Sequence, residues 1–278
     1  GADPLEMGLP FPGVRSVCLV LVKHRRLLME MARRDISDRY SGEILGSIWA
    51  FIHPLATTAV YIFLFGVVFR TKVHITAGVP ADQAIYMLSG LVPWLVTAEV
   101  FARGPGMITG QAALVKQVVF PLEVLPVKMV IATLPVLLIG LSGLIAYVFI
   151  AFGRGSFAYL LFPLAALLLY LFLLGIAFLL SALGVFLRDI KDLVQLYLLI
   201  GLYLAPIFYF MTWVPKVARP LIYINPLTVF VECFHQAGYY GGITDVRIWL
   251  IAAVLSIVSL LLGVTIVHRL KPQFGSFV

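Results

Sequence analysis

The sequence has few charged residues for its size, and this scarcity excludes the commonest class of protein. Only 12% of its 278 residues are charged, whereas a soluble domain carries roughly 25%. In contrast, 62% are hydrophobic and the mean hydropathy is +1.06. A soluble globule of this size could not cover so much apolar surface, and extended disorder requires low hydrophobicity. The composition therefore predicts an integral membrane protein.

The sequence also lacks the residues and motifs that mark common enzymes. Its two cysteines, Cys18 and Cys233, are too few for a disulfide framework. There is no P-loop, no GxSxG, no HExxH and no paired-carboxylate metal motif. Glu232 and His235 are three residues apart, but a single Glu/His pair is weak evidence for a metal. We therefore expect no catalytic residue, no bound metal and no cofactor on this chain, which has no means of hydrolysing ATP.

Several apolar stretches are present, each long enough to cross a bilayer as a helix, which takes about 20 residues. None alternates apolar and polar residues as the strands of a membrane barrel do, so the fold class predicted is an all-α integral membrane protein. The fourth stretch is overlong and is expected to tilt, bend or project beyond the lipid. The six predicted spans are Leu45–Phe69, Ala84–Ala102, Pro126–Phe152, Phe157–Leu187, Leu193–Val214 and Ile248–Val267.

The positions of the basic residues predict the orientation. Six spans place both termini on one side of the membrane. Grouping the lysines and arginines by alternate loops gives 14 on that side and 6 on the other, out of 20. The positive-inside rule then favours cytoplasmic termini. The net charge of +7 thus reports topology, and we expect no nucleic-acid partner.

The regions outside the spans have distinct characters. Residues 1–13 begin with Gly and are expected to be disordered or left over from expression. Residues 14–35 place apolar side chains on one helical face and basic ones opposite, which predicts an amphipathic helix in the cytoplasmic interface. Two interpretations stay open: an anchor on anionic lipid, or arginines that contact an anionic headgroup. Residues 45–267 form the transmembrane domain, and residues 268–278 form a cytoplasmic tail.

Two loops are expected to contain helices of their own. After Gly104-Pro105-Gly106 has ended the second span, Met107–Val119 is predicted to form a short helix. On the outer side, Pro215–Arg247 is too apolar for an ordinary loop and too short to span. A re-entrant helix-break-helix divided at Asn225-Pro226 fits it best. Glu99, near the inner end of the second span, is expected to be paired or to snorkel.

Aromatic and polar side chains follow two of the predicted spans. The first span carries a stripe at i+4 spacing, and His53 and Thr57 within it would be costly against lipid. Such residues suit either packing or contact with a sugar chain, and the sequence favours neither. The stripe on the first span consists of Trp49, His53, Thr57 and Tyr61, and the fifth span carries Tyr203, Phe210 and Trp213 on one face.

Five sequence blocks, in order along the chain, resemble the polysaccharide-export permeases among the ABC-2-type exporters. The resemblance covers nearly the whole sequence. The blocks are Arg34-Asp35 with Arg39-Tyr40 and Leu45–Ala50 with Pro54-Leu55; Val119–Pro126; Phe186–Ile190 with Ala205-Pro206-Ile207; Asn225–Thr228; and Arg269–Pro272.

This resemblance implies a function. It implies a homodimer of this chain, bound to two copies of a separate ATPase subunit that holds ATP and Mg²⁺. The cargo would be a polysaccharide on a polyprenyl-pyrophosphate lipid, and O-antigen is the first candidate. It would be moved across the bacterial inner membrane through a channel between the protomers. Alternatives are export of capsule, teichoic acid, a drug or a small lipid. From another class, a membrane-embedded polyprenyl-lipid transferase should show an aspartate-rich cluster, and none is present.

The resemblance also implies roles for particular residues. Three arginines are candidate contacts for the lipid pyrophosphate, because the guanidinium fork suits phosphate oxygens. These are Arg33, Arg34 and Arg39. The candidate channel-lining residues are Tyr40, Trp49, His53, Thr57, Tyr61, Tyr203, Phe210 and Trp213. The candidate contacts with the ATPase subunits are Arg26, Met107, Gln111, Lys116, Arg188 and Asp189.

Overall fold

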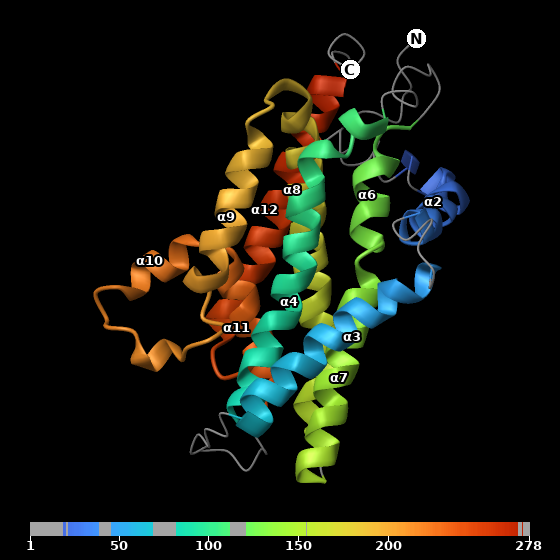
Figure 1. Ribbon diagram of the computed structural model, residues 1–278. Helices are drawn as coiled ribbons and strands as arrows, with labels where there is room; N and C mark the ends of the chain where they lie inside the picture. Colours follow the sequence, from blue (N-terminus) through green and yellow to red (C-terminus); the bar gives the residue numbers. More distant parts are fainter. Residues whose placement is uncertain are drawn as a thin grey trace.

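The computed structural model describes residues 19–20, 22–38, 46–68, 82–111, 121–153, 155–271 and 274 (Figure 1). Over these ranges the chain is all-helical and contains no strand, as the composition predicts. Residues 1–13 lie outside the described residues, as does the first part of the predicted amphipathic helix. Three predicted site residues also lie outside them, namely Arg39, Tyr40 and Lys116.

Most of the longer helices lie side by side in a bundle (Figure 1). The α-helices of the described chain are α2 (Arg25–Asp38), α3 (Trp49–Tyr61), α4 (Gln83–Arg103), α6 (Val124–Ile131), α7 (Leu134–Phe152), α8 (Phe162–Phe186), α9 (Ile190–Leu204), α10 (Arg219–Ile224), α11 (Leu227–Gly238) and α12 (Val246–Leu270), of which α2 and α10 lie at opposite edges of the bundle (Figure 1). Shorter helical segments are η2 (Gly46–Ile48), η3 (Ile62–Val68, a π-helix that continues α3), η4 (Gly104–Gly106), η5 (Thr109–Gln111), η6 (Phe157–Leu161) and η7 (Met211–Trp213).

Within the described ranges, five helical segments are long and apolar enough to cross a membrane. They are Trp49–Val68, Gln83–Gly106, Val124–Phe152, Phe157–Phe186 and Val246–Leu270. Each coincides with a predicted span. The third is divided at Ala132-Thr133, because Pro135 cannot donate a backbone hydrogen bond into the preceding turn.

The fifth predicted span, Leu193–Val214, is not one continuous helix, so the prediction of a single helix over these residues was wrong. Helix α9 ends at Leu204 after 15 residues, a length of about 22 Å, whereas the hydrocarbon core is about 30 Å thick. The cause is Pro206, which disfavours helical geometry in the residue before it. Ala205 is accordingly extended, with φ −71° and ψ 141°.

The amphipathic segment and the loop after the second span also differ from their predicted bounds. Helix α2 continues beyond residue 35 to Asp38. After Arg103 the described chain forms only the short 3₁₀ turns η4 and η5, and residues 112–120 of the predicted Met107–Val119 helix lie outside the described residues. On the other side of the molecule, α10 and α11 meet at Asn225-Pro226, as the helix-break-helix interpretation requires.

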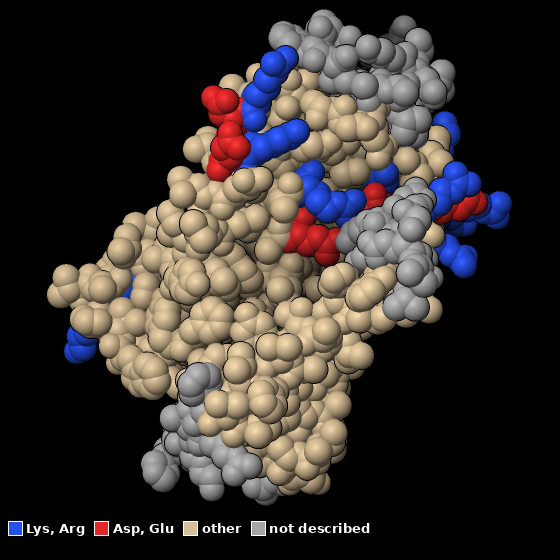
Figure 2. All heavy atoms as spheres, in the orientation of Figure 1, with Lys and Arg blue, Asp and Glu red and all other residues tan. Residues whose placement is uncertain are grey.

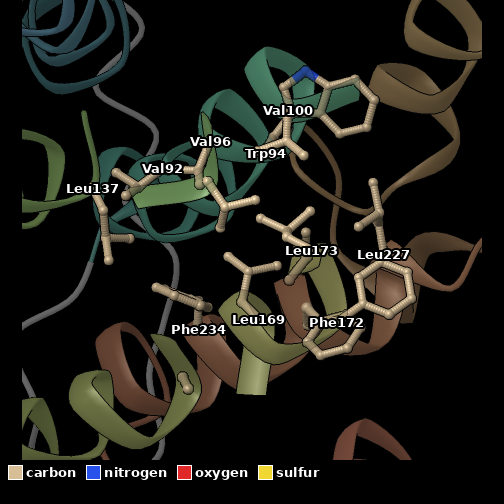
Figure 3. Close-up of a cluster of buried hydrophobic side chains, with 14 of the residues drawn as sticks. Val92, Trp94, Val96, Val100, Leu137, Leu169, Phe172, Leu173, Leu227 and Phe234 are labelled. Carbon is tan, nitrogen blue, oxygen red and sulfur yellow. The ribbon is translucent and has the colours of Figure 1, made fainter. Parts of the chain in front are cut away.

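Helix α4 forms the centre of the bundle. In its most apolar window 83% of the residues are buried, against 11% in the span that contains α3. The side chains around α4 come from α7, α8 and α11, and they interlock in one cluster (Figure 3). The cluster includes Val92, Trp94, Val96, Val100, Leu137, Leu169, Phe172, Leu173, Leu227 and Phe234.

Small residues allow the backbones of helices α8 and α12 to come into direct contact. A Cβ placed on Gly263 would lie 2.2 Å from the carbonyl oxygen of Gly175. Two hydroxyls cross the same interface: Ser256 donates to the carbonyl of Leu168 at 2.7 Å, and Ser259 donates to that of Phe172 at 2.9 Å. Small residues and hydroxyl bonds of this kind hold helices together where no hydrophobic driving force exists between them.

Candidate functional site

The two ends of the bundle differ in chemistry. Charged side chains on the face in Figure 2 gather mainly at the end where α2 and the α8–α9 turn lie, and most of the remaining visible surface is uncharged. We call this the charged end; α4, α8 and α12 end there, and α6 and α9 begin there. The opposite end, where α4 and α12 begin and α11 ends, is called the aromatic end. Its buried residues include Tyr86, Phe210, His235 and Tyr239.

Asp35 holds three helices together at the charged end. Its carboxylate forms an ion pair with Arg103 at the end of α4 and lies 3.7 Å from Lys128 Nζ on α6. Arg103 also lies 3.5 Å from Glu99 Oε1, which confirms that Glu99 is paired. The side chain of Lys128 is only 6% exposed, so these opposite charges compensate one another where water is scarce.

A second ion pair fixes the end of α12. Lys271 Nζ donates to Glu123 Oε1 at 2.6 Å, and Glu123 directly precedes α6. The ring of the buried Phe274 lies 6.0 Å from that of Phe186 at the end of α8. The start of α6 is therefore tied both to α2, through Lys128, and to the end of α12.

The polar stripe of α3 borders a pocket of about 250 Å³ at the charged end. His53 and Thr57 contribute to its wall from α3, and Glu99 contributes from α4. The Thr57 hydroxyl donates to the His53 carbonyl at 2.8 Å, and the Trp49 and His53 rings are 5.1 Å apart. The remaining lining is apolar and comes from α2, α3, α4 and the α6–α7 junction: Ile36, Ala50, Pro54, Leu95, Ala132, Pro135 and Val136. The pocket thus combines an imidazole, a hydroxyl and a carboxylate on an apolar wall.

An aromatic row connects α3 to the end of α9. Tyr61 stacks on Phe65 with centroids 6.1 Å apart and on Phe208 at 6.3 Å. Phe208 in turn lies 6.4 Å from Tyr203. Tyr203 is 67% exposed, so the row reaches the surface. The structure therefore brings together Tyr61 and Tyr203, two of the predicted channel residues from different helices.

Phe210 and Trp213 occupy a different aromatic cluster. Phe210 is 5% exposed and its ring lies 4.2 Å from that of Tyr86 on α4. Trp213, at 63% exposure, packs edge-on against Phe210 at 5.0 Å. Tyr239 closes the cluster against Tyr86 at 5.1 Å. Burial, reinforced by the Asp82 carboxylate, raises the pKa of Tyr239 to about 12, so its hydroxyl stays protonated at neutral pH.

The corner between α10 and α11 is fixed from two sides. Asn225 Oδ1 accepts a bond from the Leu227 amide at 3.1 Å and another from the Tyr197 hydroxyl of α9 at 2.8 Å. The Thr228 hydroxyl donates back to the Ile222 carbonyl at 2.7 Å. The Asn225–Thr228 block thus shapes a corner and attaches it to α9.

The other predicted site residues occupy varied positions. Arg33 and Arg34 are exposed on α2, beside the Asp35 ion pairs. Among the predicted ATPase contacts, Arg26, Arg188 and Asp189 are exposed, Gln111 is half-buried and Met107 is buried. Their roles stay predictions.

Some residues of these sites were not singled out from the sequence. Asp35 belongs to the first of the five sequence blocks, but no role was predicted for it. The prediction concerned Arg33 and Arg34 instead, because arginine is favoured in phosphate binding. Phe208 and Lys128 carried no signal, since neither stands in a recognisable spacing with the residue it contacts.

The chain is similar to known transport proteins over nearly its whole length. Residues 26–239 match the family described as ABC-2 type transporter. An O-antigen export system permease protein RfbA of Myxococcus xanthus is 26% identical over 258 residues, which cover 92% of this chain and 96% of that protein. Two RfbA permease proteins of Klebsiella pneumoniae are 25% and 24% identical, each over 90% of this chain and 93% of their own length.

Proposed function

The chain belongs to the ABC-2 type transporter family. We propose that it is the membrane permease subunit of an ATP-driven exporter of polyprenyl-pyrophosphate-linked polysaccharide, and that O-antigen is the favoured cargo. The named function of its relatives supports this cargo, and the match extends over nearly the full length of both chains. ATP hydrolysis is supplied by a separate ABC ATPase subunit, which binds the nucleotide and Mg²⁺.

The charged end faces the cytoplasm of a bacterial inner membrane in this proposal. The positive-inside rule supports that orientation, because most of the lysines and arginines that the structure describes lie at this end. With both termini cytoplasmic, α9 and the irregular Ala205–Phe210 segment, which consists of turns and bends, together make one more crossing in addition to the five long helical segments. Helices α10 and α11 then enter from the outer side and return. Their attachment to Tyr197, in the middle of α9, supports this depth.

Two copies of the chain form the transport path. A polysaccharide in hydrocarbon would leave its hydroxyls unsatisfied at several kcal/mol each, so it requires a protein-lined corridor. The span containing α3 is only 11% buried within one chain, which leaves a large apolar and aromatic surface for a second copy. The aromatic row from Tyr61 through Phe208 to Tyr203 is the observation that carries the proposal. It offers weak, repeated stacking surfaces that let a sugar chain slide.

The cytoplasmic contacts follow from the same orientation. Arg33 and Arg34 on α2, with Arg39 next along the chain, bind the lipid pyrophosphate. The pocket that Ile36 of α2 lines together with His53 and Thr57 receives the first sugars. The exposed Arg26, Arg188 and Asp189, together with the chain around Met107, Gln111 and Lys116, meet the ATPase subunits.

The proposal is tested by truncating the aromatic row. Tyr61→Ala with Tyr203→Ala should reduce ATP-dependent export of lipid-linked O-antigen in proteoliposomes at least tenfold, because the stacking surfaces are lost. Assembly with the ATPase subunit and basal ATP hydrolysis should persist. Phe149→Ala is the matched control, since Phe149 is an aromatic side chain 53% exposed on α7, away from the row. Normal export by the double variant would refute the path, and export of free lipid alone would identify a small-lipid exporter.

A further inference from the structure

His235 is held in the interface between α11 and α4 at the aromatic end. Its side chain has no exposed surface, and its ring stacks on that of Tyr86 with centroids 3.8 Å apart and planes 23° apart. Gly90 makes room for it: a Cβ on Gly90 would lie 2.7 Å from His235 Nε2 and 3.2 Å from Val231 Cγ1. The imidazole therefore lies directly against the backbone of α4, and it is buried because α11 packs against α4.

Buried polar atoms at this interface lack hydrogen bonds. Neither ring nitrogen of His235 has a hydrogen-bond partner in the part of the chain that the structure describes, and the same holds for Glu232 Oε1. His235 Nδ1 and Glu232 Oε1 are 3.9 Å apart, one helical turn from each other on α11. An uncompensated buried charge costs several kcal/mol, so the pair is least costly when it carries no net charge. That state holds one proton on the two groups together.

Two tyrosines of the described chain lie near the pair and stay uncharged around neutral pH. Burial raises the pKa of Tyr239 to about 12 and raises that of Tyr240 also, so both stay neutral. Among the charged residues nearby, Asp82 and Asp245 cap α4 and α12, and Arg219 donates a hydrogen bond to the Val214 carbonyl. Among the described residues, the titratable and charged groups on the elements around the pair are Asp82 and Tyr86 from the start of α4, Tyr209 after α9, Arg219 and Tyr223 from α10, Cys233 on α11, and Tyr239, Tyr240 and Asp245 before α12.

We propose that Glu232 and His235 form a proton-binding site that makes the packing of α11 against α4 depend on pH. When α11 leaves α4, both side chains meet water, where exposed glutamates ordinarily lose their proton at about pH 4.3 and exposed histidines at about pH 6.5. Between these values the open pair also holds one proton, so opening is independent of pH. Above about pH 6.5 opening releases the proton, and each further unit favours the open state about tenfold. Below about pH 4.3 opening takes up a second proton, and acidification favours opening in the same way.

Cys233 provides the measurement. It is 1% exposed on α11, next to Glu232, so a maleimide reaches its thiol only when α11 leaves its packing. In the full chain with Cys18→Ala, purified in detergent, we compare the labelling rate of the folded protein with that in sodium dodecyl sulfate at each pH. The ratio removes the intrinsic pH dependence of the thiol. Protection should be constant from pH 5 to 6.5 and then fall about tenfold per unit up to pH 8.

Isosteric variants of the pair should reverse or extend this dependence. In Glu232→Gln the closed state holds a neutral imidazole, so protection should fall on acidification below about pH 6.5 and stay constant above it. In His235→Gln the closed state holds a protonated carboxyl, so protection should fall with every unit of rising pH from 5 to 8. The double variant should show no dependence, and Glu30→Gln, on the exposed face of α2, should match the parent.

The labelling measurements test the proton-binding site independently of the proposed transport function. A parent profile that is flat from pH 5 to 8, or a Glu232→Gln profile with the parent's slope, would refute the proton site. If one variant shows no protection at any pH because it does not fold, the parent profile and the remaining single variant still decide. The site does not depend on the cargo proposed above, because the readout involves neither substrate nor ATP.

Discussion

The charged end and the aromatic end of the bundle are closed by different kinds of contact. At the charged end, carboxylates and basic groups from α2, α4 and α6 compensate one another. There Gly184 brings α8 against backbone: a Cβ on it would lie 2.0 Å from the Pro105 carbonyl oxygen. At the aromatic end, Gly90 brings α4 against a side chain instead, that of His235.

This difference indicates how the two ends respond to force. A backbone carbonyl moves only if its whole segment moves, whereas a side chain can change rotamer. The charged end is therefore a fixed platform on which a partner can push, and the aromatic end can rearrange around its buried rings. Rigid helices that meet at one adjustable interface are a common basis for switching between states.

The sharpest test of the fixed platform is Gly184→Ala. The added methyl would overlap the Pro105 carbonyl, so α8 and η4 would have to separate. We expect a loss of about 3 kcal/mol in the free energy of unfolding, at the upper end for overpacked sites. Thermal and denaturant unfolding in detergent would measure it.

Gly110→Ala is the matched control, because a Cβ at Gly110 has no atom within 4 Å. It should change stability by less than about 1 kcal/mol. Equal behaviour of the two variants would show that the α8–η4 contact yields easily, and the contrast between the ends would fail.

The next largest effect is expected from Asp35→Asn. The amide keeps the shape of the side chain and removes the negative charge that faces Arg103 and Lys128. Because Arg103 is 27% exposed, the loss should be nearer 2 kcal/mol than the larger values of fully buried pairs. Faster proteolysis within α2 would report the helix leaving α6. Glu30→Gln, exposed on the same helix, should leave the cleavage rate unchanged, and similar rates for both variants would exclude the anchoring role of Asp35.

The sequence predicted the spans well because hydropathy over 20 residues depends on composition alone. The prediction of a continuous helix failed at α9. The apolar stretch continues to Val214, but Pro206 ends the helix. The rule that a residue before proline disfavours helical geometry predicts the end of α9 at this point.

The sites were harder to predict, since spacing along one helix gives a face but not what that face meets. The i+4 stripe correctly placed His53 and Thr57 together, yet only the structure shows Glu99 across the pocket from them. The Asp35–Arg103 pair joins residues 68 apart in sequence, a separation with no periodic signal. Phe210, which is expected on the channel wall, packs on Tyr86 within one chain because the break at Pro206 turns its segment inward, and its place in a channel stays a prediction.

The smallest expected effect concerns the attachment of the adjustable end to α9. Tyr197→Phe removes the hydroxyl that donates to Asn225 Oδ1 at 2.8 Å, while the Leu227 amide still bonds the same oxygen. One acceptor site is left unused and no buried group loses all its partners, so the cost should be about 1 kcal/mol. Tyr203→Phe, with its side chain at the surface, should cost less than about 0.5 kcal/mol. Because the bond fixes the corner from which α11 begins, Tyr197→Phe should also raise Cys233 labelling at pH 6 about fivefold. An unchanged labelling rate would mean that α11 is held by its packing against α4 and α8 alone, and the corner would then belong with the rigid part of the molecule.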